Sequence, residues 1–155
     1  MSGNKNTCLK LHTLAQKLWR SGGVCRPFAK TVQYVAQIFL GCFIGCEAEL
    51  DPTVQFVHNG LGVVIHDTAS IGQGSVVCQQ VTIGVPYPLG GGDSVNRAPT
   101  IGSHVLIGCG AKLIGPITIG DGARIGANAV VLNDVPAGAT VVGIPASVVR
   151  NGGAS

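Results

Sequence analysis

Aliphatic side chains recur at every sixth position from residue 65 onward. Val, Ile and Leu make up 43 of the 155 residues, so by chance they would fill fewer than a third of such positions. All ten in-phase positions contain one of them: Ile65, Ile71, Val77, Ile83, Ile101, Ile107, Leu113, Ile119, Ile125 and Val131. Gly follows six of the ten. The pattern is therefore an internal repeat of six-residue units.

A period of six fits neither an amphipathic helix nor a lone half-buried strand. It predicts a short strand with one aliphatic side chain pointing inward, followed by a corner where Gly relieves crowding. Three such sides close one coil, so residues 18 apart should stack, with Ile83 over Ile65. Stacked coils stabilise one another, and this indicates a mainly β chain wound into a parallel β-helix. Three residues continue the count upstream: Ile44, Leu50 and Phe56.

Two interruptions of the repeat are candidate functional loops. After Phe56 the segment Val57 to Gly62 is inserted. Between Ile83 and Ile101, three prolines and three consecutive glycines favour an excursion loop at about residues 85–99. Two positions inside that stretch stay in phase, so one further coil is the alternative. Loops on a rigid scaffold often contain the functional residues.

The N-terminal segment has helical patterns instead of the repeat. Leu11, Leu14, Ala15 and Leu18 have the spacing of one helix face. Pro27 suits the first position of a second helix, and the residues expected on one side of that helix are Phe28, Val32, Val35 and Phe39. We expect a helical hairpin of about residues 8–41 leaning on the first coil. The predicted organisation is a helical cap at 1–43, a β-helix domain at 44–150 and a disordered tail at 151–155.

Charge and cysteine content indicate which ligands the protein can attract and in which compartment it works. Six of the ten Lys and Arg residues precede residue 31, whereas the first acid is Glu47. This basic segment is either a solvated helix face or a surface that attracts anionic groups. The six cysteines show no C-x2-C pair, which disfavours a zinc site and indicates buried, reduced thiols. The N-terminus is polar and charged, unlike a secretory leader, so we expect a cytoplasmic protein.

Several motifs together resemble the hexapeptide-repeat acyltransferases: VVIHDTASIG, VTIG, the GGGD loop, NRAPTIG, VLIGCGAKLIGPITIGDGARIGANAVV and the closing VVGIPA. The chain is most similar to the branch containing serine O-acetyltransferase and its short sugar- and polysaccharide-acetylating relatives, over about residues 44–150. The resemblance implies a left-handed parallel β-helix of hexapeptide repeats with a short N-terminal helical hairpin. It also implies acetyl-CoA as co-substrate and a homotrimer with active sites between neighbouring subunits.

The same resemblance assigns roles to individual residues. His58 matches the family's histidine that acts as general base, and imidazole is well suited to removing a proton near neutral pH. The positions that match the coenzyme A site are Val85, Cys109, Lys112 and Ala127. The substrate-binding candidates are Asn59, Asp93 and Arg97. The other three histidines lie in a helix or in continuing coil units, and we assign them no chemistry: His12, His66 and His104.

The chain departs from serine acetyltransferase at positions linked to serine and to the catalytic histidine. Ala98 replaces its second active-site histidine, Val57 replaces an aspartate associated with the amino acid, and Phe43 aligns with the carboxylate that orients the catalytic histidine. Three acidic residues are candidates to replace that carboxylate, with a backbone carbonyl as the alternative: Glu47, Glu49 and Asp51. These losses favour an acceptor that presents a simple hydroxyl group.

We therefore predict an acetyl-CoA-dependent O-acetyltransferase whose acceptor is a sugar or polysaccharide precursor. The alternatives are a divergent serine O-acetyltransferase in cysteine synthesis and a non-catalytic β-helix scaffold. A zinc-dependent carbonic anhydrase of the same architecture is disfavoured, because the histidine spacings do not predict convergence. We expect a homotrimer that binds a small-molecule or carbohydrate acceptor, with no nucleic acid and no metal. The basic hairpin would suit weak association with the inner face of the membrane.

Overall fold

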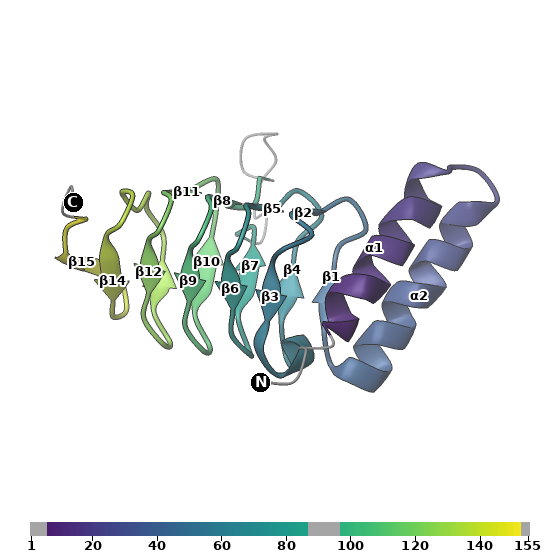
Figure 1. Ribbon diagram of the computed structural model, residues 1–155, viewed down its shortest axis with the longest axis horizontal. Helices are drawn as coiled ribbons and strands as arrows, with labels where there is room; N and C mark the ends of the chain where they lie inside the picture. The colour runs from purple at the N-terminus through teal and green to yellow at the C-terminus, as the bar shows by residue number, and fades with distance from the viewer. Residues whose placement is uncertain (1–5, 87–96, 153–155) are drawn as a thin grey trace.

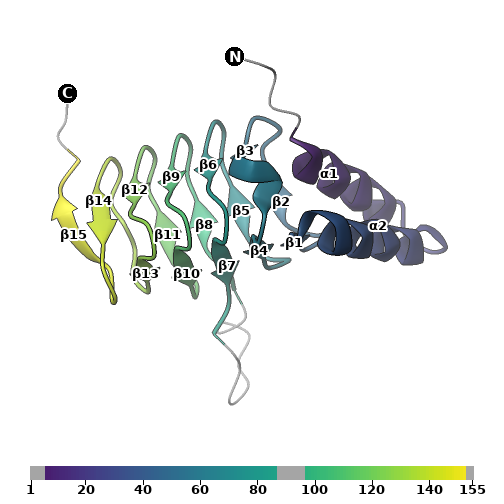
Figure 2. The same cartoon turned by 90° about the horizontal axis from the view of Figure 1, so that it is seen from below.

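The computed structural model describes residues 6–86 and 97–152, which form a helical hairpin followed by a long stack of short strands (Figure 1). Helix α1 spans Thr7–Arg20 and helix α2 spans Cys25–Leu40. Each six-residue unit contributes a short strand and then turns a corner, as the period of the repeat predicts. The two helices lie together at one end of the stack in both views (Figure 2).

Three sheets form the faces of the stack. Sheet A contains β1 (Phe43–Ile44), β4 (Val64–Ile65), β7 (Thr82–Gly84), β10 (Lys112–Ile114) and β13 (Val130–Val131). Sheet B contains β2 (Glu49–Leu50), β5 (Ser70–Ile71), β8 (Thr100–Ile101) and β11 (Thr118–Ile119). Sheet C contains β3 (Gln55–Phe56), β6 (Val76–Val77), β9 (Leu106–Ile107), β12 (Arg124–Ile125), β14 (Thr140–Val142) and β15 (Ser147–Arg150). The coils pair in parallel, and β15 closes sheet C by running antiparallel to β14.

The core is a column of aliphatic side chains along the axis of the coils. The predicted stacking is confirmed, since Ile65 pairs with Ile83 and Ile101 with Ile119. All ten in-phase residues are buried, each with 2% or less of its surface exposed. The buried hydroxyl of Ser75 donates to the Gly102 carbonyl at 2.9 Å and accepts from the Val105 amide at 3.0 Å. This polar side chain is therefore satisfied inside an otherwise apolar core.

Both interruptions of the repeat fall at corners between sheets. Ile44 pairs with Ile65, and Ile71 pairs with Ile101, so the additional residues do not displace the strands. The first interruption contains the short segment η1 (Val57–Gly60). In the second, residues 87–96 lie outside the described residues, as do 153–155 of the predicted tail. Because β5 pairs directly with β8, and β7 with β10, no further coil separates them.

The hairpin covers the open end of the first coil and satisfies part of its backbone. The Gln16 amide donates to the Ala48 carbonyl at 2.8 Å, where His12 Nε2 also lies at 3.1 Å. The Gln33 amide donates to the Ile44 carbonyl at 2.9 Å. An uncovered edge would leave such groups unpaired and open to further strand pairing. Neither described helix has the length and apolarity needed to cross a bilayer.

Two details of the second helix differ from the prediction. It begins at Cys25, so Pro27 is its third residue and not its first. Proline fits there equally well, because the first turn of a helix has no internal partner for its N–H groups. The side that packs inward includes Ala29 and Ala36, whereas Phe28 and Phe39 are 61% and 79% exposed. The small residues let the two helices and the first coil approach closely, which the large aromatic rings would prevent.

Candidate functional site

Successive corners between sheets C and A stack into one edge of the prism, which we call edge CA and which comprises residues 57–63, 78–81, 108–111 and 126–129. Backbone hydrogen bonds link its corners. The Gln80 amide donates to Leu61 O at 2.8 Å, Gly110 to Gln79 O at 2.9 Å, and Asn128 to Cys109 O at 2.8 Å. The edge is therefore a continuous ridge of ordered backbone.

His58 lies at the end of this edge nearest the hairpin. His58 and Asn59 both adopt left-handed backbone conformations, with φ of 52° and 56°. The next residue, Gly60, is buried, and a Cβ atom there would approach Cys8 Sγ to 3.1 Å. The Gly62 amide donates to the Gly41 carbonyl at 2.7 Å. The segment is thus held between hairpin and coil, while the imidazole of His58 stays exposed.

The carboxylates expected to orient His58 are bound elsewhere. Glu47 accepts a hydrogen bond from Trp19 Nε1 at 2.8 Å, and Glu49 pairs with Arg20 at 3.7 Å. Asp51 accepts from the Thr53 side chain and amide, and these bonds hold the pKa of Asp51 below its usual value. Among the described residues, no group makes a hydrogen bond to the His58 imidazole. Within one chain, its ring is free to accept a proton from a bound molecule.

Three of the predicted coenzyme A residues lie on or beside edge CA. Cys109 Sγ donates to Gln79 Oε1 at 3.3 Å, Lys112 Nζ donates to the Gln80 carbonyl at 2.8 Å, and Ala127 is exposed. A Cβ atom at Gly108 would lie 2.7 Å from the Ala127 amide nitrogen, so the close approach of these corners requires glycine. Small side chains thus leave the surface of the edge open.

The thiol of Cys78, which lies on edge CA near Cys109, stays protonated and therefore uncharged. Partial burial raises the pKa of Cys78, and the neighbouring Cys109 raises it further. Edge CA therefore presents uncharged side chains, small ones at Cys109 and Ala127, next to Lys112. This surface suits a long, flexible ligand with an anionic end.

Two further predicted site residues belong to the next edge, where sheets A and B meet, which we call edge AB and which includes residues 66–69, 85–86 and 97–99. Val85 follows β7 and is half-buried, and Arg97 is exposed. Asp93 lies outside the described residues. The structure therefore groups His58 with Asn59, Cys109, Lys112 and Ala127, but it places Val85 and Arg97 on a different edge.

His66 is a candidate that the sequence interpretation passed over. Its Nδ1 accepts from the Thr68 amide at 3.2 Å and lies 3.1 Å from Thr68 Oγ1. The same hydroxyl accepts from the Ala98 amide at 2.9 Å. The His66 imidazole thus lies close to Ala98, the position at which serine acetyltransferase has its second active-site histidine. The pairing of Ser70 with Thr100 reveals this proximity, and the six-residue count alone did not.

A metal centre finds no support in the described residues. No three His, Cys, Asp or Glu side chains among residues 6–86 and 97–152 come close enough together to hold an ion.

Comparisons with known proteins agree with the repeat and the fold. A family model described as bacterial transferase hexapeptide (six repeats) matches residues 98–133. Soybean serine acetyltransferase is 37% identical, with a TM-score of 0.84 over 94% of this chain and 58% of that one. The Neisseria gonorrhoeae enzyme in complex with serine is 34% identical, with a TM-score of 0.82 over 92% and 55%.

A third solved structure extends this likeness. Serine acetyltransferase from Brucella abortus strain S19 is 33% identical, with a TM-score of 0.81 over 96% of this chain and 57% of that one. The chain thus spans little more than half the length of the proteins it matches. A comparison with curated proteins finds no match.

Proposed function

This chain belongs to the hexapeptide-repeat acyltransferases, in the branch that resembles serine O-acetyltransferase, and its fold is a left-handed β-helix; from this we propose that it transfers an acetyl group from acetyl-CoA to a hydroxyl acceptor. The observation that supports this most is the placement of His58. The His58 imidazole is exposed at the end of edge CA nearest the hairpin. The backbone of its segment is hydrogen bonded to Gly41 on one side and to Gln80 of the next coil on the other.

The proposed reaction is a direct transfer. His58 accepts the proton of the acceptor hydroxyl as its oxygen attacks the thioester carbonyl carbon. The carbon–sulfur bond then breaks, and the coenzyme A thiolate takes the proton from the imidazolium. Cys109 and Ala127 on edge CA would bind the pantetheine arm, and Lys112, whose ammonium group lies beside this edge, would bind a phosphate group.

We propose that a homotrimer completes this site. Within one chain, His58 and Arg97 lie on different edges, so acceptor and base meet only if edge AB of a neighbouring copy faces edge CA. Val85, Arg97 and His66 of the second copy would then lie near the acceptor.

L-serine is the acceptor that the comparisons favour, because the matched structures are serine acetyltransferases and one of them contains serine. A carbohydrate hydroxyl is the second candidate, and the sequence differences favour it. Ala98 is buried with its amide bonded to Thr68, and Val57 has no charge, so neither side chain can pair with an amino acid's ammonium or carboxylate group. His66 is the polar group near enough to compensate.

The test is release of free thiol from acetyl-CoA with L-serine and with a panel of sugars and nucleotide sugars. We expect turnover with at least one of these hydroxyl acceptors, and the acceptor with the largest kcat/KM identifies the substrate class. Absence of thiol release with every acceptor, together with no rise in melting temperature at millimolar coenzyme A, would instead favour the scaffold hypothesis.

Ala127→Phe should raise the KM for acetyl-CoA about tenfold or more, which corresponds to roughly 1.4 kcal/mol of lost binding. The ring would occupy the open surface of edge CA, whereas the fold should tolerate it because Ala127 is exposed. Ala137→Phe is the matched control. Its amide nitrogen would contact a Cβ atom at Gly120, so Ala137 has the same relation to a glycine on another edge as Ala127 has to Gly108. Equal KM values in both variants would remove Ala127 from the coenzyme site.

We also propose that the protein is cytoplasmic and that the hairpin associates weakly with anionic membranes. All six cysteines are free, as is usual in a reducing compartment, where disulfides are transient. The first 46 residues contain six bases and no acid. Helix α2 exposes Phe28, Ile38 and Phe39 at 61%, 75% and 79%. Apolar and basic groups together favour an interfacial position on anionic lipid.

Flotation with vesicles tests this association. We expect binding to vesicles that contain phosphatidylserine, a loss of binding in high salt, and weaker binding for Ile38→Ser. Equal recovery with pure phosphatidylcholine vesicles would show that the basic charge has no such role, and no binding to either would refute the proposal.

A further inference from the structure

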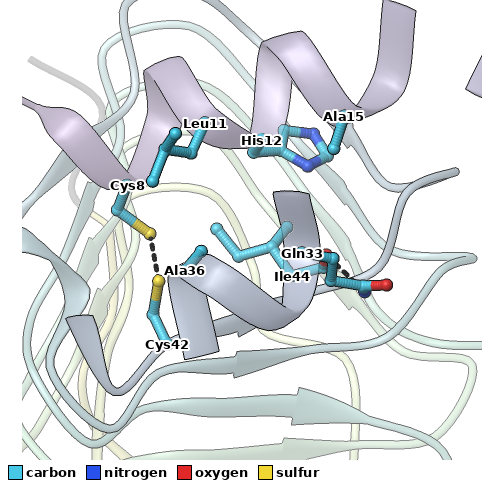
Figure 3. A pocket seen from close by; sticks show the side chains of 8 residues that line it. All are labelled: Cys8, Leu11, His12, Ala15, Gln33, Ala36, Cys42 and Ile44. Carbon is cyan, nitrogen blue, oxygen red and sulfur yellow. Dashed lines mark hydrogen bonds between the residues drawn. The ribbon is translucent and has the colours of Figure 1, made fainter. Parts of the chain in front are cut away.

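Two thiols from distant parts of the sequence meet beneath the hairpin (Figure 3). Cys8 belongs to the first turn of α1, and Cys42 lies between α2 and β1. Their Sγ atoms are 2.8 Å apart, and each residue is only 1% exposed. A covalent S–S bond is about 2.05 Å long, so the two sulfurs need a movement of less than about 1 Å to reach it.

The surroundings of the pair are apolar and uncharged. The thiols line a cavity of about 10 Å³ with Leu11, His12 and Ile44, which is room for about one water molecule. Burial lowers the pKa of His12, so this ring is neutral near pH 7. Its Nδ1 is buried and has no hydrogen-bond partner among the described residues. A neutral imidazole therefore lines the same cavity as the two thiols.

The two thiols differ in acidity. Their mutual hydrogen bond and burial raise the pKa of Cys8, whereas the bond from Cys8 lowers the pKa of Cys42. Thiolates are the nucleophiles in disulfide exchange, and either thiol can donate in the hydrogen bond that joins the pair, so the one that is deprotonated attacks first once an oxidant reaches them. An oxidant can reach the two buried thiols only when the first turn of α1 opens. One side chain, Asn6, anchors that turn by donating to the Val54 carbonyl at 2.7 Å.

We propose that Cys8 and Cys42 are a redox modification site, at which a reversible disulfide ties α1 to the first coil. Glutathione disulfide is the oxidant class. The thiolate of one cysteine of the pair attacks one of its sulfurs, the glutathione S–S bond breaks, and a glutathione thiolate leaves and is protonated. The thiolate of the other cysteine then attacks the protein sulfur of the mixed disulfide and releases a second glutathione. Two protein thiols are oxidised, and one glutathione disulfide is reduced to two thiols.

The bond would lie directly beneath the segment that contains His58. A Cβ atom at Gly60 would come within 3.1 Å of Cys8 Sγ and 3.6 Å of Cys42 Cβ. Helix α1, the first coil and the His58 segment therefore meet at this pair. The oxidation state of the pair sets how firmly the hairpin is fixed to them, independently of the reaction that the protein performs.

The native chain is the material for the main test. It is equilibrated with glutathione and glutathione disulfide at several ratios, the remaining thiols are alkylated, and the digest is analysed by mass spectrometry. We expect a Cys8–Cys42 linked peptide, lighter by two hydrogen atoms than the two thiol peptides together, and its loss after reduction. The oxidised protein should melt about 5 °C or more above the reduced form, because the bond constrains the unfolded chain.

Matched variants assign the bond. Cys46→Ala keeps both thiols of the pair and should still form the linked, oxidised species, whereas Cys42→Ala should lose it. The proposal is overturned if Cys8 and Cys42 are both alkylated at ratios that oxidise other cysteines of the chain. It is also overturned if the sole products are glutathione adducts or disulfides between chains.

Discussion

His58→Asn should lower kcat for acetyl transfer about 10²–10⁴-fold, the usual contribution of a general base. An amide cannot take up the proton of the attacking hydroxyl. Asparagine tolerates the left-handed backbone at this position, where φ is 52°, and the exposed His58 imidazole makes no hydrogen bond within the described residues. The fold should therefore persist. Steady-state kinetics with the preferred acceptor, beside melting curves of both proteins, measure the two effects separately.

His104→Asn is the matched control. His104 is also exposed and has a φ of 56°, but it lies at a corner between sheets B and C, away from edge CA. We expect its kcat to stay within about twofold of the parent, in line with the small effects of surface substitutions. If the two variants lose activity equally, or if His58→Asn remains fully active, His58 is not the base.

Ile107→Ala should lower the free energy of unfolding by about 2–5 kcal/mol. Ile107 is completely buried in β9, between Val77 below and Ile125 above. Truncation leaves a cavity that the stacked coils cannot close, because backbone hydrogen bonds fix their spacing. Urea unfolding at a fixed protein concentration measures the change, since assembly makes apparent stability depend on concentration.

The neighbouring residue of the same strand provides the comparison. Leu106 is 39% exposed and points away from the core, so Leu106→Ala should cost less than about 1 kcal/mol. Losses of similar size in the two variants would contradict the alternation of inward and outward residues that the six-residue period predicts.

The repeat allowed most of the fold to be predicted from local pattern. Each of the ten in-phase aliphatic residues from Ile65 to Val131 is buried, and the register places Ile83 over Ile65 as expected. The hairpin was also predicted closely, with helices at Thr7–Arg20 and Cys25–Leu40. A coil contacts mainly its two neighbours, so a pattern within about twenty residues contains nearly all the information on its conformation.

The candidate site was less predictable, because it depends on which corners of the coils the tertiary structure brings together. The His58 corner was found from the interruption of the repeat. Glu47, Glu49 and Asp51 each have a partner other than His58, and the proximity of His66 to Ala98 was not foreseen. Glu47 and Glu49 bind helix α1, and the approach of His66 to Ala98 joins residues that the count separates by one coil plus an insertion. Such contacts are not visible as a period.

By itself, the sequence determined the six-residue coil, the inward-facing residues and a family resemblance that the comparisons confirm, because these follow from short-range periodicity and local motifs. Only the tertiary structure decided which corners share an edge, which face of α2 is exposed, and that Cys8 lies against Cys42. Those outcomes depend on the register between coils and on the docking of the hairpin. Both are set by packing between segments that are far apart along the chain.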